Sequence, residues 1–237
     1  MLQQAWYTLG RAGVGVYAQL MLDMDISRHA PLPKGPKIIA ANHPTTTDPV
    51  LITQVTSEPI HILITEMCFK VPVVGKSLRM AGHIPVVAGN GRAAFDEAIQ
   101  LLRDGKTIGI FPEGALSPLD GGACHPHTGI ARMALMAGVP VIPVGIHVER
   151  DGIKFIETTV DDKTETARWY LRGPYAMTVG EPMWLEGHIE DRQYVRSVSE
   201  RIMQRISGLS HESAQRIGAP QAPRSSDWLP VRLARAH

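Results

Sequence analysis

The fold of this chain is decided by the stretch Lys37-Ile38-Ile39-Ala40-Ala41, which is followed at once by Asn42-His43. The stretch comes after a proline-rich linker at residues 31–36, and apolar residues run through it without a break from Ile38 onward. This pattern is typical of a short buried strand. We therefore expect His43 to lie at the carboxyl end of a strand.

Downstream of this strand, segments with helical and strand-like patterns alternate. In chain order they are residues 48–56, 60–64, 67–80, 84–87, 92–102, 107–111, 130–137 and 141–148. Such alternation is typical of a largely parallel sheet covered by helices. The helix from Arg92 has the clearest pattern, with an apolar stripe and Gly105 as its C-terminal stop.

Two further strands are predicted at residues 153–157 and 175–179, and a further helix at residues 190–207. The fold prediction is one α/β domain with a largely parallel central sheet covered by helices, plus an N-terminal amphipathic helix and a C-terminal tail. We divide the chain into an N-terminal segment, the main domain and a basic tail containing Pro and Ser. Their ranges are 1–30, 31–209 and 210–237.

Composition narrows the functional classes. A chain of 237 residues suits one sizeable α/β domain, and 44% hydrophobic with 20% charged residues is ordinary for a globular protein. The net charge of +1 gives no overall reason to expect a nucleic-acid partner. Cys68 and Cys124 show neither metal-type spacing nor a disulfide framework, which favours a reducing compartment such as the cytoplasm.

Both ends of the chain have features that suit a membrane surface. The first 22 residues mix aromatic and aliphatic residues with Gln and Arg, as in a helix that lies in a bilayer interface, but a helix packed on its own domain has the same pattern. No run of eighteen apolar residues exists, so we expect no spanning helix. The tail has four arginines against one aspartate from Ala214 onward. Such a tail can contact an anionic membrane surface, but a disordered tail or a strap across the domain is the more common outcome.

Two polar segments follow predicted strands. One is Asn42-His43-Pro44-Thr45-Thr46-Thr47-Asp48, and the other is Phe111-Pro112-Glu113-Gly114. In open α/β sheets, ligands bind at the carboxyl ends of the strands, so the two segments share one cleft if their strands are parallel neighbours. The alternative for Asp48-Pro49 is a simple helix start, with aspartate as N-cap and proline at the first helical position.

A histidine with an aspartate partner can activate an alcohol. The ordinary pKa of histidine, about 6.5, leaves much of His43 neutral and able to accept a proton. Asp48 would hold the second ring nitrogen and stabilise the imidazolium as it forms. The backbone N–H groups of residues 42–45 or near Gly114 are candidate donors to the oxyanion.

In these segments the chain resembles the glycerolipid acyltransferase family of the lysophosphatidate acyltransferase type, whose first and third motifs are Asn-His-x-x-x-x-Asp and Phe-Pro-Glu-Gly. Residues 82–86 with the helix after them resemble the second motif, and residues 139–144 resemble the fourth. The resemblance covers roughly residues 35 to 190 and implies catalytic, acceptor-binding and motif-supporting residues. The resemblance implies that His43 and Asp48 are the catalytic pair. It implies that the acceptor is bound by Glu113, Gly114 and Arg92. The residues that support the motifs would be Asn42, Phe111, Pro112 and Pro140.

The resemblance also implies substrates and partners. A fatty acyl group would move from acyl-CoA or acyl carrier protein directly to the hydroxyl of a lysophospholipid, with 1-acylglycerol-3-phosphate favoured, and without a cofactor, a metal or a nucleic-acid partner. The enzyme would act as a peripheral protein on the cytoplasmic side of a membrane. His125 and His127 lie beside Cys124, but no third ligand has convincing spacing. Ser117 lacks a Gly-x-Ser-x-Gly setting and is a poor nucleophile candidate.

The chain departs from the family at the residues that usually bind phosphate. Arginines are expected where this chain has Val87-Ala88, and again where it has Leu116. The planar guanidinium of arginine holds its N–H donors in a fixed fork that matches a phosphate group. Aliphatic side chains have no such donors and cannot replace it. Basic residues of neighbouring segments are possible replacements. They are Arg92, Lys76, Arg79 and Arg132.

These departures leave other functions open. An O-acyltransferase for a non-phosphorylated lipid or glycolipid would not need the arginines. A thioester hydrolase would use water in place of the alcohol at the same His43 base. In a non-catalytic peripheral lipid-binding protein, His43 and Asp48 would be only a turn residue and a helix cap.

Overall fold

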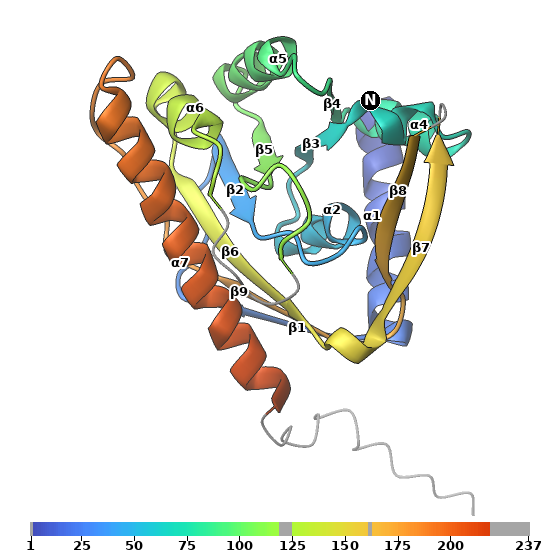
Figure 1. The fold of residues 1–237 in the computed structure, drawn as a ribbon. Helices are drawn as coiled ribbons and strands as arrows, with labels where there is room; N and C mark the ends of the chain where they lie inside the picture. Colours follow the sequence, from blue (N-terminus) through green and yellow to red (C-terminus); the bar gives the residue numbers. More distant parts are fainter. Residues whose placement is uncertain (1, 119–124, 161–162, 219–237) are drawn as a thin grey trace, which may run out of the picture.

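The computed structural model describes residues 2–118, 125–160 and 163–218. Its centre is a seven-stranded sheet with strand order β1-β9-β6-β2-β5-β3-β4, and β7 and β8 form a separate two-stranded sheet (Figure 1). The strands are β1 (Leu22–Arg28), β2 (Lys37–Ala41), β3 (Ile60–Thr65), β4 (Ile84–Val86), β5 (Thr107–Ile110), β6 (Val141–Val148), β7 (Ile153–Val160), β8 (Lys163–Tyr170) and β9 (Gly173–Val179). The sequence therefore predicted the α/β class and the central sheet correctly.

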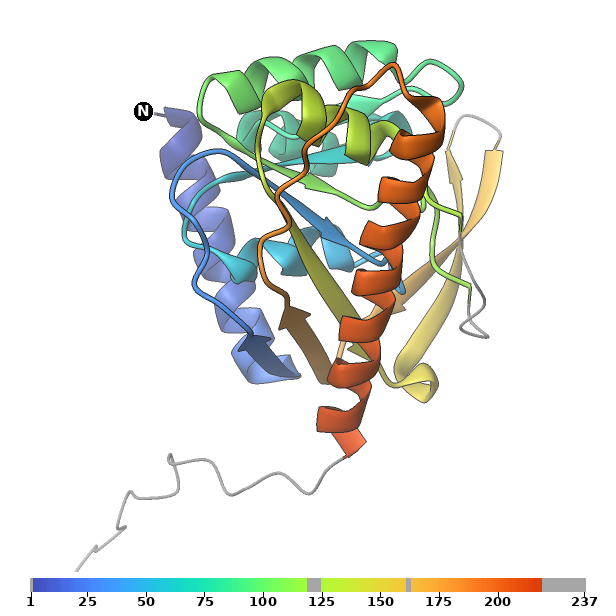
Figure 2. The same cartoon turned by 90° about the vertical axis from the view of Figure 1, so that its left-hand side faces the viewer.

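Helices cover both faces of the sheet (Figures 1 and 2). They are α1 (Leu2–Met21), α2 (Asp48–Leu51), α3 (Glu66–Lys70), α4 (Val74–Ala81), α5 (Arg92–Arg103), α6 (Gly129–Ala137) and α7 (Arg192–Gly218), with single 3₁₀ turns η1 (Ile52–Val55) and η2 (Arg150–Gly152). The long helix α7 crosses β6 and β9 on the same face as α5 and α6, whereas α1 and α2 lie on the opposite face.

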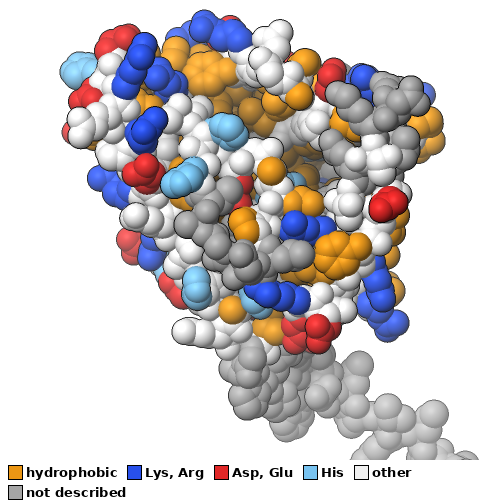
Figure 3. Space-filling view, viewed as in Figure 1, with side chains coloured by type: hydrophobic (Ala, Val, Ile, Leu, Met, Phe, Trp, Pro, Cys, Tyr) orange, Lys and Arg blue, Asp and Glu red, His pale blue; other side chains and the backbone are white. Residues whose placement is uncertain are grey.

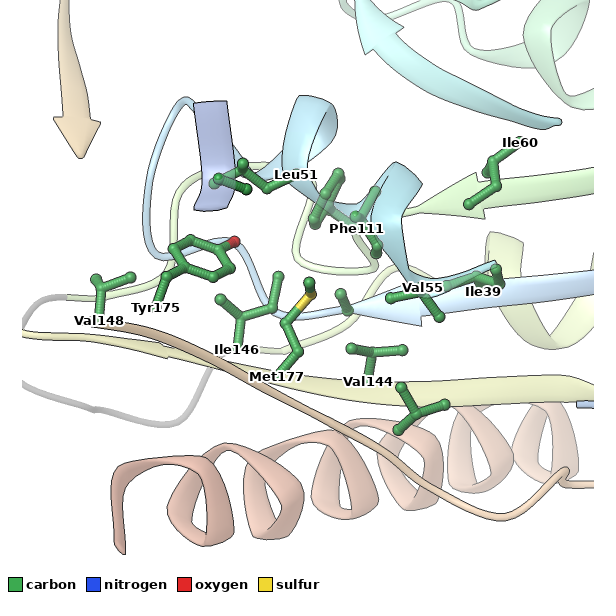
Figure 4. Packing of buried hydrophobic residues seen from close by; sticks show 14 of the residues in the cluster. Ile39, Leu51, Val55, Ile60, Phe111, Val144, Ile146, Val148, Tyr175 and Met177 are labelled. Atoms are coloured by element: carbon green, nitrogen blue, oxygen red, sulfur yellow. The ribbon is translucent and has the colours of Figure 1, made fainter. Parts of the chain in front are cut away.

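The central strand β2 lies between β5 and β6 and runs parallel to both. Its residues are all buried, and they alternate between the two faces because successive side chains of a strand point in opposite directions. Ile38 and Ala40 enter the cluster beneath α5, α6 and α7, while Ile39 and Ala41 enter the cluster on the α2 side (Figure 4). The segments after β2 and β5 therefore leave the same edge of the sheet, as predicted.

The sheet is not wholly parallel. Strand β9 pairs antiparallel with β6 and parallel with β1, so β1 and β9 run against the other five strands. The pairing of β1 with β9 joins the N-terminal segment to the last strand, through the register Leu22↔Gly173 to Arg28↔Val179.

Several predicted elements have different bounds in the structure. Residues 67–80 form two helices, α3 and α4, separated at Pro72 and Val73. Val73 has φ +66°, and Val74 N–H donates to the Pro72 carbonyl at 2.7 Å, which makes Val73 the centre of a tight γ-turn. Helix α7 continues past residue 207 to Gly218 and so enters the segment expected as tail. Residues 219–237, including Trp228, lie outside the described residues.

The N-terminal helix ends at Met21, and the expected helical segment gives way to β1 at Leu22. One side of α1 packs on the domain, where the Tyr7 hydroxyl accepts the Ile60 N–H at 3.1 Å and Arg11 donates to the carbonyls of Thr53 and Thr56. Large hydrophobic side chains are exposed elsewhere on the helix. These are Trp6, Leu9, Val16, Leu20 and Met21. Within the described residues, every helix is too short or too polar to cross a bilayer.

Candidate active site

The structure brings His43 and Asp48 together at the carboxyl end of β2. The chain turns after Ala41, and helix α2 begins at Asp48, so that Nδ1 of His43 lies 3.0 Å from Oδ2 of Asp48. Asp48 is fully buried, and the His43 side chain keeps 17% exposure. The imidazole thus has one nitrogen bound to a buried carboxylate and a ring that is still open to solvent.

Asp48 is held by four hydrogen bonds. Its Oδ2 also accepts the Thr45 N–H at 2.7 Å, and its Oδ1 accepts the hydroxyls of Thr45 at 2.6 Å and Tyr175 at 2.8 Å. Figure 4 shows Tyr175 within the apolar cluster with its hydroxyl turned toward α2. A buried carboxylate needs such partners because desolvation is costly, so this network is what keeps Asp48 inside the domain. Asp48 is not a helix N-cap here, because Thr47 occupies that position.

Tyr175 acts only as a donor in this network. Complete burial, with the nearby Asp48 charge as the second cause, holds the pKa of the Tyr175 hydroxyl well above its usual value of 10.0. The phenol therefore stays protonated and keeps donating to Asp48. Tyr175 is a site residue that sequence reasoning missed, because it comes from β9, more than a hundred residues along the chain from Asp48.

Phe111 fixes the plane of the histidine ring. The two rings stack with centroids 4.2 Å apart and an interplanar angle of 22°. Phe111 follows β5, so the packing of β5 against β2 places the third motif directly over the first. With Asp48 at one nitrogen and Phe111 on one ring face, the imidazole has little freedom to rotate.

Glu113 joins the two loops. It is 5% exposed, and its Oε1 accepts the backbone N–H of His43 at 3.1 Å and the Ser117 hydroxyl at 2.6 Å. The same His43 N–H lies 2.9 Å from the Ser117 hydroxyl oxygen, and Ser117 N–H donates back to the His43 carbonyl at 2.8 Å. Ser117 is therefore a link between the loops.

Gly114 occupies a position that favours glycine. Its φ of +68° lies in the left-handed region, and a Cβ built on it would lie 2.6 Å from the His127 ring. The backbone N–H of His127 donates to the Pro112 carbonyl at 2.8 Å, so the chain at His127 lies against the same turn. The position after Glu113 thus has a steric reason to be glycine.

Three of the candidate oxyanion donors already have hydrogen-bond partners within the protein. The N–H of His43 donates to Glu113 and Ser117, that of Thr45 to Asp48, and that of Gly114 to the Phe111 carbonyl at 3.1 Å. Pro44 has no N–H. The N–H groups of His43, Thr45 and Gly114 are therefore occupied within the protein in this conformation, and the N–H groups of Asn42 and of the residues just after Gly114 stay candidate oxyanion donors.

The family model described as Acyltransferase matches residues 23–147, which is more than half of the chain and spans both loops. The chain belongs to the acyltransferase family. The resemblance read from the four motifs is thereby confirmed.

Two relatives of this acyltransferase have names that state an activity. A 1-acyl-sn-glycerol-3-phosphate acyltransferase of Borreliella burgdorferi is 33% identical over 114 residues, which cover 46% of this chain and 45% of the relative. One of Bacillus subtilis is 23% identical over 209 residues, which cover 86% of this chain and 92% of the relative. The match thus spans less than half the length of the first relative and most of the second.

A solved structure has a similar fold. The crystal structure of the 1-acyl-sn-glycerophosphate acyltransferase PlsC from Thermotoga maritima superposes with a TM-score of 0.57 at 24% sequence identity, covering 84% of this chain and 78% of that one. At this identity the likeness concerns the fold.

The supporting residues of the acyltransferase lie in different parts of the fold. Asn42 joins β2 to β6, with its Nδ2 donating to the Ile146 carbonyl at 2.9 Å and its Oδ1 accepting the Ile146 N–H at 2.7 Å. Pro140 lies just before β6, at the opposite edge of the sheet from His43, where its carbonyl accepts the Ile38 N–H at 3.0 Å. Asn42 supports the site directly, whereas Pro140 supports the sheet.

The four basic residues considered for phosphate have other partners or exposed positions. Arg92 is paired with Asp96 on its own helix at 2.8 Å, and this pairing raises the pKa of the Arg92 guanidinium. Arg79 donates to the Phe69 carbonyl, Arg132 to the Ile189 carbonyl, and Lys76 is exposed. Among the described residues, we find no hydrogen bond from these four to the loops of His43 and Glu113.

Metal-binding groups of three or more His, Cys, Asp or Glu side chains are absent from residues 2–118, 125–160 and 163–218. The Cys124 expected beside His125 lies outside the described residues.

Proposed function

We propose that this acyltransferase moves a fatty acyl group from acyl-CoA or acyl carrier protein to the hydroxyl of a lysophospholipid, with 1-acylglycerol-3-phosphate as the first acceptor to test. The observation that carries the proposal is the His43–Asp48 pair at 3.0 Å, with Glu113 against the same loop. The names of the two relatives support this choice of acceptor.

In this mechanism His43 acts on the acceptor through Nε2, because Nδ1 faces Asp48. Nε2 accepts the proton of the acceptor hydroxyl while the hydroxyl oxygen forms a bond to the thioester carbonyl carbon. Asp48 holds Nδ1–H and stabilises the imidazolium. The tetrahedral intermediate then collapses, the carbon–sulfur bond breaks, and the proton on Nε2 passes to the leaving thiolate. Neither an acyl-enzyme nor a cofactor is required, and the thioester is a co-substrate.

Glu113 and Gly114 form the acceptor side of the proposed site. Oε1 of Glu113 holds the two loops together, so its second carboxylate oxygen is the atom proposed to accept a hydrogen bond from an acceptor hydroxyl. Gly114 keeps the turn narrow at this point. Arg92, at the start of α5, stays a proposed acceptor-binding residue.

We also propose a peripheral position on the cytoplasmic face of a membrane. The exposed hydrophobic side chains of α1 support this location, since Trp, Leu and Val on one side of a surface helix favour a bilayer interface.

The test is release of CoA thiol from palmitoyl-CoA with and without lysophosphatidate, in the native chain and in His43→Ala. We expect acceptor-dependent release that falls at least about 100-fold in His43→Ala, since a general base contributes about 10²–10⁴. His188→Ala is the matched control, because His188 is exposed and outside the site.

The other functions give different results in the same assay. Release without acceptor that is lost in His43→Ala indicates a hydrolase. Transfer to monoacylglycerol or a glycolipid, but not to lysophosphatidate, indicates a non-phosphorylated acceptor. No release with either palmitoyl-CoA or palmitoyl-acyl carrier protein, over all these acceptors, contradicts the catalytic proposal and favours lipid binding alone.

A further inference from the structure

The β7–β8 hairpin is docked on the active-site loops. Through its backbone, Arg168 of β8 makes two hydrogen bonds with Thr46, which lies between His43 and Asp48. Thr46 N–H donates to the Arg168 carbonyl at 2.7 Å, and Arg168 N–H donates to the Thr46 hydroxyl at 3.0 Å. In Figure 1 the hairpin forms one side of the region into which these loops extend. The position of Arg168 is therefore fixed relative to the catalytic pair.

The side chain of Arg168 reaches the second loop. Its Nη1 donates to the Ser117 carbonyl at 2.5 Å, and Ser117 in turn contacts both His43 and Glu113. The side chain is only partly buried. A guanidinium has five N–H donors, and among the described residues we find one hydrogen bond from them, so most are open to a ligand in this part of the structure. Figure 3 shows basic side chains in the middle of this face, next to hydrophobic ones.

The charge at this position complements the site. The two loops contribute the carboxylates Asp48 and Glu113. Leu116 in the second loop, and Val87-Ala88 after β4, stand where arginines were expected. The phosphate of a phosphorylated acceptor is negatively charged, as are these carboxylates, so the two repel each other. Binding the phosphate beside them therefore requires a cation. Arginine provides planar donors that match a phosphate group.

We propose that Arg168 binds the phosphate of the acceptor and so determines the preference for a phosphorylated over an uncharged lysolipid. This inference rests on the proposed acyl transfer. The β7–β8 hairpin thus supplies, from a different part of the chain, the cation that the two motif loops lack. Ser117 contacts both the guanidinium, through its carbonyl, and Glu113, through its hydroxyl, and Glu113 is where the acceptor hydroxyl is proposed to bind.

The experiment compares the native chain with Arg168→Gln and Arg168→Lys, using lysophosphatidate and monoacylglycerol as acceptors. For Arg168→Gln we expect KM for lysophosphatidate to rise about 10- to 100-fold, the loss typical of a charge-assisted hydrogen bond. We expect kcat, and the KM for monoacylglycerol, to change less than about threefold. Arg168→Lys keeps the charge and should recover part of the affinity.

Arg172→Gln is the matched control, because Arg172 is exposed at the end of the same hairpin. It should leave both KM values unchanged. If Arg168 only fastened the loops together, Arg168→Gln would lower kcat for both acceptors alike, and the proposal would be overturned.

Binding measurements separate this proposal from the proposed function. If the native chain transfers no acyl group, equilibrium binding of lysophosphatidate and monoacylglycerol in detergent micelles still tests Arg168. Weaker binding of lysophosphatidate alone in Arg168→Gln supports the phosphate contact. Equal binding by the native chain and the variant, or weakening of both ligands alike, overturns it.

Discussion

Replacement of Asp48 by asparagine separates the structural role of this residue from its proposed catalytic one. Asparagine can turn its oxygen toward the Thr45 N–H and the His43 ring, and its NH₂ group then faces the hydroxyls of Thr45 and Tyr175. Hydroxyls can accept as well as donate, so each buried hydrogen bond can be made again. What is lost is the charge.

We therefore expect Asp48→Asn to lose little stability but much of its kcat. Loss of charge assistance should lower the free energy of unfolding of Asp48→Asn by about 1–2 kcal/mol. In contrast, Asp48→Ala leaves the Thr45 N–H and the Tyr175 hydroxyl without an acceptor, at about 1–3 kcal/mol for each group, or about 2–6 kcal/mol in total. The neutral amide no longer stabilises the imidazolium, so kcat of Asp48→Asn should fall about 10²–10⁴-fold.

The assays are urea unfolding followed by circular dichroism and steady-state acyl transfer to lysophosphatidate. Tyr175→Phe is the matched control, because it removes one hydrogen bond to Asp48 and leaves the charge. Its unfolding free energy should fall by about 1–2 kcal/mol, and kcat should stay within about tenfold of the native value. A folded Asp48→Asn chain with native kcat would refute the catalytic role. A loss of stability as large as that of Asp48→Ala would refute the exchange of hydroxyl roles.

Two further predictions concern the turn at Gly114 and the buried His83. Gly114→Ala should cost about 1–2 kcal/mol in urea unfolding for its left-handed φ alone, and adding His127→Ala should relieve only the steric part. Burial, with the His61 charge second, lowers the pKa of His83 from 6.5 to about 4, so the unfolded chain takes up this proton first. The contribution of neutral His83 to the free energy of unfolding is therefore fully present above pH 6.5. As the pH falls toward 4, the free energy of unfolding decreases by at most about 3 kcal/mol. His83→Asn should flatten this slope in urea midpoints measured from pH 7.5 to 4.5.

The sequence predicted those parts of the site that follow from local pattern. An unbroken apolar run identified β2, and the alternation of elements predicted a largely parallel sheet, in which the structure makes β2 and β5 parallel neighbours. These two facts place His43 beside Glu113. His43 and Asp48 are separated only by one turn and the start of a helix, so short-range geometry was enough to predict that their side chains meet.

Two strands were missed for different reasons. Strand β1 has alternating residues, with Leu22, Met24 and Ile26 between polar ones, and this period of two was hidden by the helical pattern before it. Strand β8 is rich in Thr and charged residues, and much of it forms a hairpin outside the main sheet, so it has no apolar run to detect.

The contacts of Tyr175 and Arg168 depend on tertiary structure. Tyr175 reaches Asp48 because β9 pairs with β6, and Arg168 reaches Ser117 because the hairpin folds back over the loops. No periodicity in a single sequence encodes such pairings between distant segments. The break between α3 and α4 was readable, since Pro72 disfavours a continuous helix.

The pairing of β1 with β9 has a consequence for the order in which the protein forms during synthesis. Leu22 must wait for Gly173, about 150 residues later, before it gains its partner, and contacts so distant in sequence form slowly. Tyr175 emerges from the ribosome with the same late strand. A nascent chain that ends before β9 can therefore contain every family motif and still lack the hydroxyl that holds Asp48. Completion of the His43–Asp48 pair, with Asp48 held by Tyr175, is thus tied to nearly full translation of the domain.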